Sequence, residues 1–332
     1  MSAGIDAAGA RNAWLTADAW RRLFRDRPLI PLIGLLVALV VILQLARPGI
    51  VTADWLGVTL RAAVPLAILA GCQTLTMLTG GIDLSVGAVG SMAAFLMASL
   101  VTGQGPAVAI AVGLGAAALA GLVNGVGVGI FKVHPLIMTL GMGLVILGLM
   151  SVYQLAMVQS GVVIPDFIEW LGSETSLGFL PNNLLLFLPV AAVIIVGLRR
   201  SGYGRLLFAV GDNPVAARLA GARVWQVLVV LYVISAVLAA FAGFLVAGLI
   251  KTATIQLVEE SVLPSVAAAV IGGTSIMGGR GGYSGTIVGA LILVVLTTLL
   301  TVLSMPEAAR QILFGLIIVA VAAVYTRVTG ES

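Results

Sequence analysis

The chain has 332 residues, of which 61% are hydrophobic and 9% are charged, and its formal net charge is +4. Soluble domains carry roughly 25% charged residues, so a mean hydropathy of +1.18 over this length excludes an aqueous fold. The sequence therefore predicts an all-α polytopic membrane protein. The basic charges are placed at helix boundaries rather than in a patch for nucleic acid, and the single cysteine, Cys72, excludes an internal disulfide.

The first 28 residues form a charged leader that ends in a cluster of arginines. A secretory signal peptide has a shorter charged region and a small-residue cleavage site after its apolar run. Neither feature is found here, so residues 1–28 are expected to remain as a cytoplasmic tail, with residues 327–332 as a second one.

A spanning helix needs about 20 largely apolar residues. This criterion predicts about ten spans within one transmembrane domain, residues 29–326. The predicted spans are 29–46, 58–78, 84–102, 106–131, 135–157, 182–198, 225–249, 262–278, 284–303 and 309–325.

Charge asymmetry fixes the orientation expected for these spans. With the N-terminus inside, thirteen of the seventeen basic residues lie on inner segments. Cytoplasmic loops carry the excess of lysine and arginine, so both termini and the segment 199–223 are expected in the cytoplasm. The basic residues left on the outer side are Arg47, Arg61, Lys251 and Arg310.

The first polar interruption is LTGGIDLSVG, residues 78–87. Gly80 and Gly81 can end one helix, and Asp83 or Ser85 can cap the next. A carboxylate at membrane depth is costly and is by default a functional candidate. Asp83 is therefore either a capping residue or a gate or hydrogen-bonding contact on a substrate path.

Two further polar residues follow in the next spans. Asn124, within GLVNGVGVG, either bonds a neighbouring helix or lines a pathway, and interhelical bonding is favoured. His134 is the only histidine, which excludes a histidine-based metal cluster. Because it lies between Lys132 and Pro135, it is interpreted as a structural residue at an inner helix boundary.

The longest outer connection is residues 158–181. Trp170 and Leu171 lie there among acidic residues, a composition typical of a short helix at the membrane interface. The helix serves either as a docking surface for an external partner or as an interfacial anchor.

A short polar segment, residues 204–221, reads GRLLFAVGDNPVAARLAG. Asn213 can cap a helix, Pro214 suits its first position, and Gly221 can close its end in a left-handed conformation. Such a helix has about two turns and is too short to be stable alone in water. It is expected to rest on its own chain or on a partner protein.

The charges of this segment agree with that interpretation. Asp212 is expected at the positive end of the helix dipole and Arg218 in the last turn, where each charge is favoured.

The glycine-rich run IGGTSIMGGRGGYSGT, residues 271–286, lacks the Gly-Lys-Ser/Thr ending of a phosphate-binding loop. Its glycines are expected to permit tight turns and close helix contact. With LTGGIDLSVG it forms a weak internal echo, so an inverted repeat is possible. Since Asp83 is the only acid flanked closely by apolar sequence on both sides, energy delivered from outside the membrane is favoured over ion coupling.

Four motifs together resemble the permease subunits of bacterial ABC sugar importers of the ribose, xylose and galactose type. The resemblance covers nearly the whole chain after residue 55. The motifs, in order, are LTGGIDLSVGAV, GLVNGVGVGIFKVHPLIMTLGM, GRLLFAVGDNPVAARLAGARV and AAAVIGGTSIMGGRGGYSGTIVGALI.

The resemblance implies a type II ABC importer-like fold in the bacterial inner membrane. Two permease chains, identical or paralogous, would form the path. A cytoplasmic ATP-binding subunit would hold ATP and Mg, and an extracytoplasmic sugar-binding protein would deliver the substrate. This chain itself is expected to bind no cofactor or metal, to catalyse no reaction and to contact membrane lipid.

The resemblance also places a coupling helix within residues 211–221. This helix would enter a groove on the ATPase, which is consistent with small residues at 216 and 217. The residues expected to couple to the ATPase are Gly211, Asp212, Asn213, Pro214, Ala216, Ala217, Arg218 and Gly221. The candidates for the substrate pathway or a gate are Asp83, Ser85, Asn124, Thr139 and Thr274.

Other functions are carried as alternatives. The wider superfamily includes permeases for nucleosides and branched-chain amino acids, which these motifs discriminate poorly. An ion-coupled secondary transporter with inverted repeats is a less favoured alternative. An intramembrane enzyme is disfavoured, because the chain lacks a suitable histidine, serine or paired-aspartate constellation.

Overall fold

The computed structural model describes residues 29–156, 161–176, 178–306, 308–313 and 315–316. The predicted tails, 1–28 and 327–332, lie outside these residues, as does most of the predicted span 309–325.

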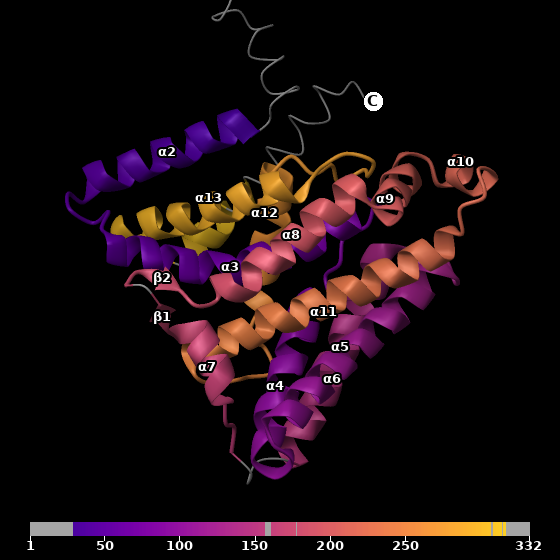
Figure 1. Ribbon diagram of the computed structural model, residues 1–332, viewed down its shortest axis with the longest axis horizontal. Helices are drawn as coiled ribbons and strands as arrows, with labels where there is room; N and C mark the ends of the chain where they lie inside the picture. Colours follow the sequence, from indigo (N-terminus) through magenta and orange to yellow (C-terminus); the bar gives the residue numbers. More distant parts are fainter. Residues whose placement is uncertain (1–28, 157–160, 177, 307, 314, 317–332) are drawn as a thin grey trace, which may run out of the picture.

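The described chain is almost entirely helical (Figure 1). Its first half contains α2 (Leu29–Ala46), α3 (Ala53–Met77), α4 (Val86–Gln104), α5 (Pro106–Gly129) and α6 (Pro135–Ala156). A short connection follows, with α7 (Asp166–Ser173), β1 (Thr175–Ser176) and β2 (Leu180–Pro181). The second half contains α8 (Leu184–Arg200), α9 (Gly202–Asp212), α10 (Pro214–Leu219), α11 (Val224–Ile250), η2 (Glu259–Ser261), α12 (Val262–Ile271) and α13 (Tyr283–Val302). The two strands pair antiparallel, with Ser176 opposite Leu180.

Seven helices in the described part of the chain are long and apolar enough to cross a membrane. The pair α8 and α9, bent by 68°, makes an eighth if the two count as one span. An all-α polytopic fold is thereby established, whereas the predicted number of ten spans is not reached in these residues.

The predicted span 262–278 is wrong. The helix there, α12, has ten residues and ends at Ile271, so it is about 15 Å long at 1.5 Å per residue. The hydrocarbon core is about 30 Å thick. The helix stops because Gly273 takes a left-handed φ of 89°, which opens the loop that runs to Tyr283.

The long helix α11 is the centre of the bundle. It packs against α3, α4 and α5, and the short helix α7 rests on its C-terminal half. On the other side, α13 packs against α2, α3 and α12. Figure 1 shows α2 at the edge of this second group, and its outward face is largely apolar and exposed.

Helix α6 presents the face that a bilayer would cover. It packs on α4 and α5, and large apolar side chains cover its opposite side. In water this surface would be unfavourable, because apolar area is stabilised by removal from water. The exposed apolar side chains of α6 include Leu144, Leu149, Val152 and Leu155.

Close backbone contact at glycine joins the central helices. A Cβ atom added at Gly243 in α11 would overlap the carbonyl oxygen of Gly90 in α4. A Cβ atom at Gly113 in α5 would lie 2.6 Å from the carbonyl oxygen of Ala93 in α4. Helices in a membrane associate through such small-residue contacts, so these glycines set the spacing between α4 and its neighbours.

We expect Gly243→Ala to lower the free energy of unfolding by about 1–3 kcal/mol, because the added methyl group overpacks against rigid backbone. Equilibrium unfolding in mixed detergent micelles would measure the change. The matched control is Gly115→Ala in α5, whose Cβ would meet nothing within 4 Å. A loss of stability in the control as large as in Gly243→Ala would contradict the packing explanation.

Candidate functional site

A hydrogen-bonded polar cluster lies at the break between α3 and α4. Asp83, only 2% exposed, accepts hydrogen bonds at Oδ1 from the backbone N–H of Ser85 (3.0 Å) and from its hydroxyl (2.6 Å). Its other oxygen, Oδ2, accepts from the Ser235 hydroxyl at 3.0 Å. The carboxylate therefore joins the start of α4 to the middle of α11.

Other helices complete the cluster. Asn124 of α5 donates from Nδ2 to the Ser85 hydroxyl at 2.9 Å. Thr139 of α6 accepts from the backbone N–H of Leu84 at 3.1 Å. The Gln73 side chain in α3 donates to the Asp83 carbonyl oxygen at 2.8 Å and accepts from the Asp83 amide at 3.3 Å. Five helices thus meet at one break in the chain.

The structure brings together four of the five predicted pathway candidates. Asp83, Ser85, Asn124 and Thr139 are all nearly fully buried and bonded within the cluster. Ser85 is the N-cap residue of α4 but makes no side-chain cap bond. Asp83 instead accepts a hydrogen bond from the Ser85 amide, so the carboxylate stabilises the start of α4 in place of a side-chain cap from Ser85.

Thr274, the fifth candidate, lies in the other glycine-rich loop. It is 2% exposed, and a Cβ atom added at Gly281 would lie 2.8 Å from its methyl group. Thr274 is thus packed inside the loop between α12 and α13, outside the hydrogen-bonded cluster.

Sequence reasoning missed Gln73 and Ser235, although both are fully buried members of the cluster. Each is an isolated hydrogen-bonding side chain inside a long apolar helix. Such residues commonly bond across helices in a membrane, and this signal identifies both of them. Their shared partner, however, is Asp83 in the break between α3 and α4, and helical periodicity does not predict the position of a loop residue.

The predicted capped helix is confirmed as α10. Asn213 Oδ1 accepts from the backbone N–H groups of Val215 (3.0 Å) and Ala216 (2.9 Å), and Pro214 occupies the first position. Gly221 follows the helix with a φ of 90°. These are the end signals expected for a two-turn helix.

The two faces of α10 carry side chains of different size and exposure. Ala217 is 7% exposed and packs against its own chain, so its small side chain lets the helix lie close to the bundle. Ala216 is exposed. The large apolar side chains on the outer side are Val215 (62% exposed) and Leu219 (85% exposed). Residues four apart share a helix face, a signal that sequence reasoning did not use.

The charged residues of this segment remain at the surface. Asp212 is the last residue of α9 and directly precedes the Asn213 cap, and Arg218 lies in the last turn of α10. Both are exposed.

A junction of three backbone segments lies where α9 ends. A Cβ atom at Gly211 would lie 2.6 Å from the amide of Gly279 and would overlap the carbonyl oxygen of Leu78. The Gly279 amide donates to that same carbonyl at 3.0 Å. A Cβ atom at Gly278 would lie 3.0 Å from the amide of Gly80. The end of α9 therefore touches both glycine-rich breaks, with no side chain between the backbones.

Comparison with known proteins identifies the family. Residues 56–322 match the family described as branched-chain amino acid transport system / permease component. The chain belongs to this permease family. No solved structure gives a significant match to the chain.

Several curated relatives match along most of this permease. It is 32% identical to the fructose import permease protein FrcC of Rhizobium meliloti over 89% of this chain and 84% of that protein. It is 31% identical to the ribose import permease protein RbsC of Bacillus subtilis over 87% of this chain and 89% of that protein. It is 34% identical to the galactofuranose transporter permease protein YtfT of Escherichia coli over 79% of this chain and 76% of that protein.

We expect Asp83→Ala to lower the free energy of unfolding by about 1–3 kcal/mol, because it leaves buried donors of Ser85 and Ser235 without their acceptor. Asp83→Asn keeps one oxygen for Ser85 and offers an amide to Ser235, so it should retain most of that stability. Equilibrium unfolding in detergent compares the two variants. Equal losses in Asp83→Asn and Asp83→Ala would show that the negative charge, rather than the hydrogen bonds, is what the cluster requires.

Proposed function

We propose that this permease is the membrane-spanning subunit of an ABC importer that moves a neutral sugar into the cytoplasm, driven by ATP hydrolysed on a partner subunit. The observation that carries the proposal is the match, over most of the chain, to relatives named as fructose, ribose and galactofuranose permeases. The family description names branched-chain amino acids, but all three relatives carry sugar names, which favours a sugar.

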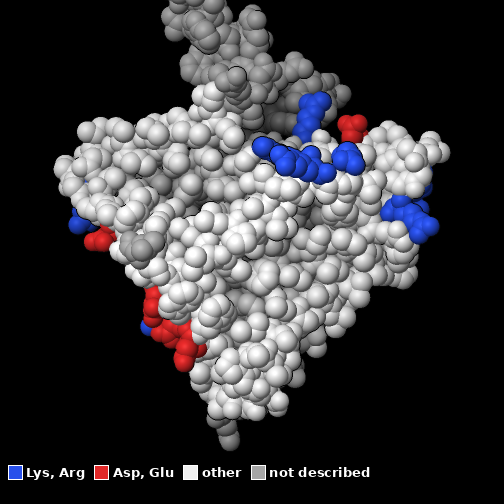
Figure 2. Space-filling view, viewed as in Figure 1, with Lys and Arg blue, Asp and Glu red and all other residues white. Residues whose placement is uncertain are grey.

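Charge supports an orientation for the subunit. Of the eleven lysine and arginine residues in the described part of the chain, five lie between the last turn of α8 and the start of α11, and two more lie in the loops that follow α5 and α12. Figure 2 shows basic side chains gathered at this end of the bundle. By the positive-inside rule this end is cytoplasmic. The seven are Lys132, Arg199, Arg200, Arg205, Arg218, Arg223 and Arg280.

The opposite end would then face outward, and α7 lies on that side. Phe167 and Trp170 of α7 stack with ring centroids 5.9 Å apart. Glu169 forms an ion pair with Lys251 at the end of α11. A sugar-binding protein would deliver substrate at this end, while a second permease chain would complete the path through the membrane.

Helix α10 would be the coupling helix. Its outer side carries Val215 and Leu219, two apolar side chains that a cytoplasmic partner would bury. At its start, the chain runs directly from Asn213 back to Gly211 and the glycine junction. A displacement of α10 by the ATPase would therefore reach both glycine-rich breaks through contacting backbone rather than through flexible side chains.

To test the function, the chain is reconstituted in liposomes with its ATP-binding subunit and its sugar-binding protein, and uptake of radiolabelled fructose and ribose is measured. We expect uptake of at least one sugar that requires ATP and both partners. Leu219→Glu should abolish this uptake and weaken association with the ATP-binding subunit, because a charge would replace the apolar contact that the partner buries. The matched control, Leu219→Met, keeps an apolar side chain of similar size and should behave as the wild type.

Two outcomes would contradict the proposal. Uptake by the chain alone, driven by an ion gradient, would identify a secondary transporter. Unchanged association and uptake in Leu219→Glu would show that α10 is not the coupling helix. Whether the chain transports a sugar would still be decided by uptake with the wild-type chain.

We expect Gly211→Ala to separate association from transport. The added methyl group would overlap Leu78 and Gly279, so it should disturb the junction without altering the outer face of α10. Pull-down of the ATP-binding subunit should remain normal, while ATP-driven sugar uptake falls at least tenfold. The control is Gly202→Ala in the same helix, whose Cβ has only the distant guanidinium of Arg205 within 4 Å. Normal uptake in Gly211→Ala would refute the junction's role.

A further inference from the structure

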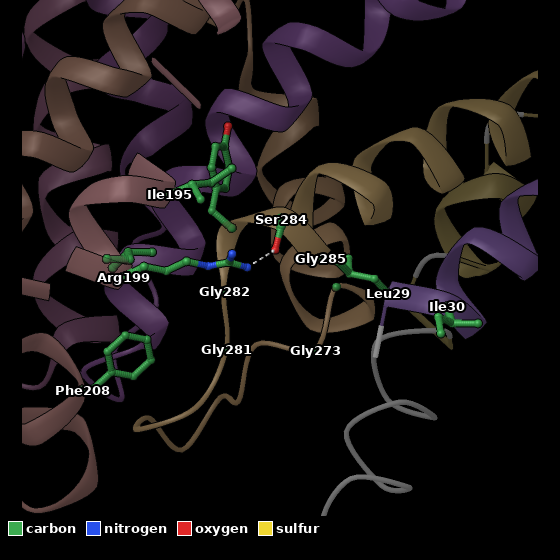
Figure 3. Close-up of a pocket in the computed structure, with 13 residues that line it drawn as sticks. Leu29, Ile30, Ile195, Arg199, Phe208, Gly273, Gly281, Gly282, Ser284 and Gly285 are labelled. Atoms are coloured by element: carbon green, nitrogen blue, oxygen red, sulfur yellow. Dashed lines mark hydrogen bonds between the residues drawn. The ribbon is translucent and has the colours of Figure 1, made fainter. Parts of the chain in front are cut away.

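A cavity of about 620 Å³ lies beside the basic end of the bundle and plays no part in the function proposed above. Its walls come from the last turns of α8, from α9, from the loop between α12 and α13, and from the first turn of α2. Figure 3 shows Arg199 reaching across it toward Ser284, with Leu29 and Ile30 on the far side. The cavity is thus bounded by a glycine loop and by two helices, α2 and α8, whose outer sides carry exposed apolar side chains.

The lining combines one cationic side chain with an apolar wall. Ile195, Leu198 and Phe208 supply apolar surface from α8 and α9, and Leu29 and Ile30 supply it from α2. At the other side, the Arg199 guanidinium donates to the Ser284 hydroxyl at 3.4 Å. A ligand that fits must therefore offer an anionic, hydrogen-bond-accepting head together with an apolar tail.

The basic residues around the cavity also favour an anionic ligand. Arg199 and Arg200 lie in the last turn of α8, and Arg205 lies one turn into α9. All three are exposed, and Figure 2 shows basic side chains clustered over this junction. Basic pockets between helices at the membrane surface bind anionic lipid head groups.

We propose that this cavity binds one anionic phospholipid, with its phosphate at Arg199 and Ser284 and an acyl chain against the apolar wall. The first turn of α13 borders the cavity and no side chain caps it, so the positive end of the helix dipole favours an anion there. The proposal rests on the cavity and its arginine and does not depend on which solute the permease carries.

The test uses the full chain, purified in detergent and titrated with phosphatidylglycerol or with phosphatidylcholine of the same acyl chains. Native mass spectrometry counts the lipids retained. We expect one phosphatidylglycerol to be retained more strongly than phosphatidylcholine. Arg199→Gln should weaken phosphatidylglycerol binding about fivefold, the effect of one basic residue near a lipid surface. The matched control is Arg223→Gln, an exposed arginine that does not line the cavity, and it should bind as the wild type.

A second variant tests the cavity by filling it. Gly282 lines the cavity in extended backbone, with a φ of 176°, and a Cβ there would meet nothing within 4 Å. Gly282→Leu should fold and lose the retained lipid. Its control, Gly141→Leu on the exposed side of α6, should keep it.

Three results would overturn the proposal. Equal retention of the two lipids by the wild type would remove the anionic preference. An equal loss of phosphatidylglycerol binding in Arg223→Gln and Arg199→Gln would show that general surface charge, not the cavity, binds the lipid. Displacement of the lipid by millimolar glycerol 3-phosphate would show that the cavity takes a free phosphate ester, and displacement by fructose or ribose would make it part of the sugar path.

Discussion

Close contact between backbones is the constraint on which this fold depends. Inside a bilayer, helices gain little by hiding apolar side chains from one another, because lipid tails are equally apolar. Attraction must come from dense packing, and the densest contacts here place glycine against main chain. Gly243 lies against Gly90, Gly248 lies against the Ile168 carbonyl, and Gly285 lies against the Gly272 carbonyl. These contacts fix α11, α7 and α13 at set distances from their neighbours, and larger residues would separate them.

The break between α3 and α4 is fixed by contacts at both of its ends. On one side, the Leu78 carbonyl accepts from the Gly279 amide beside Gly211. On the other, the Asp83 carboxylate is bonded to Ser85 and Ser235. Only four residues lie between Leu78 and Asp83, so a short segment rather than a long flexible loop joins the glycine junction to the buried cluster. The cluster in turn includes Ser235 of α11, whose hydroxyl donates to Asp83.

Local signals made part of this structure predictable from sequence. The end of α2 at Ala46, the cap at Asn213 and the closure at Gly221 were confirmed, because each depends on residues adjacent in the chain. The length of α12, the inward face of Ala217 and the partners of Asp83 were not predictable in this way. They depend on which segments meet in space, and apolar composition is nearly uniform along a membrane protein.

One face of the six-residue helix α10 packs on the bundle, and its other face is exposed to a partner. A helix this short is not stable alone in water, so the buried Ala217 and the Asn213 cap must hold it against the bundle. That seat leaves Val215 and Leu219 in solvent, where each costs roughly 1.5–3 kcal/mol relative to full burial. A partner that covers both side chains recovers this free energy without changing the contacts of Ala217 and Asn213 that hold the helix on the bundle. On the α9 side the chain leaves this helix through Asp212 and Gly211, so α10 is joined directly to the glycine junction.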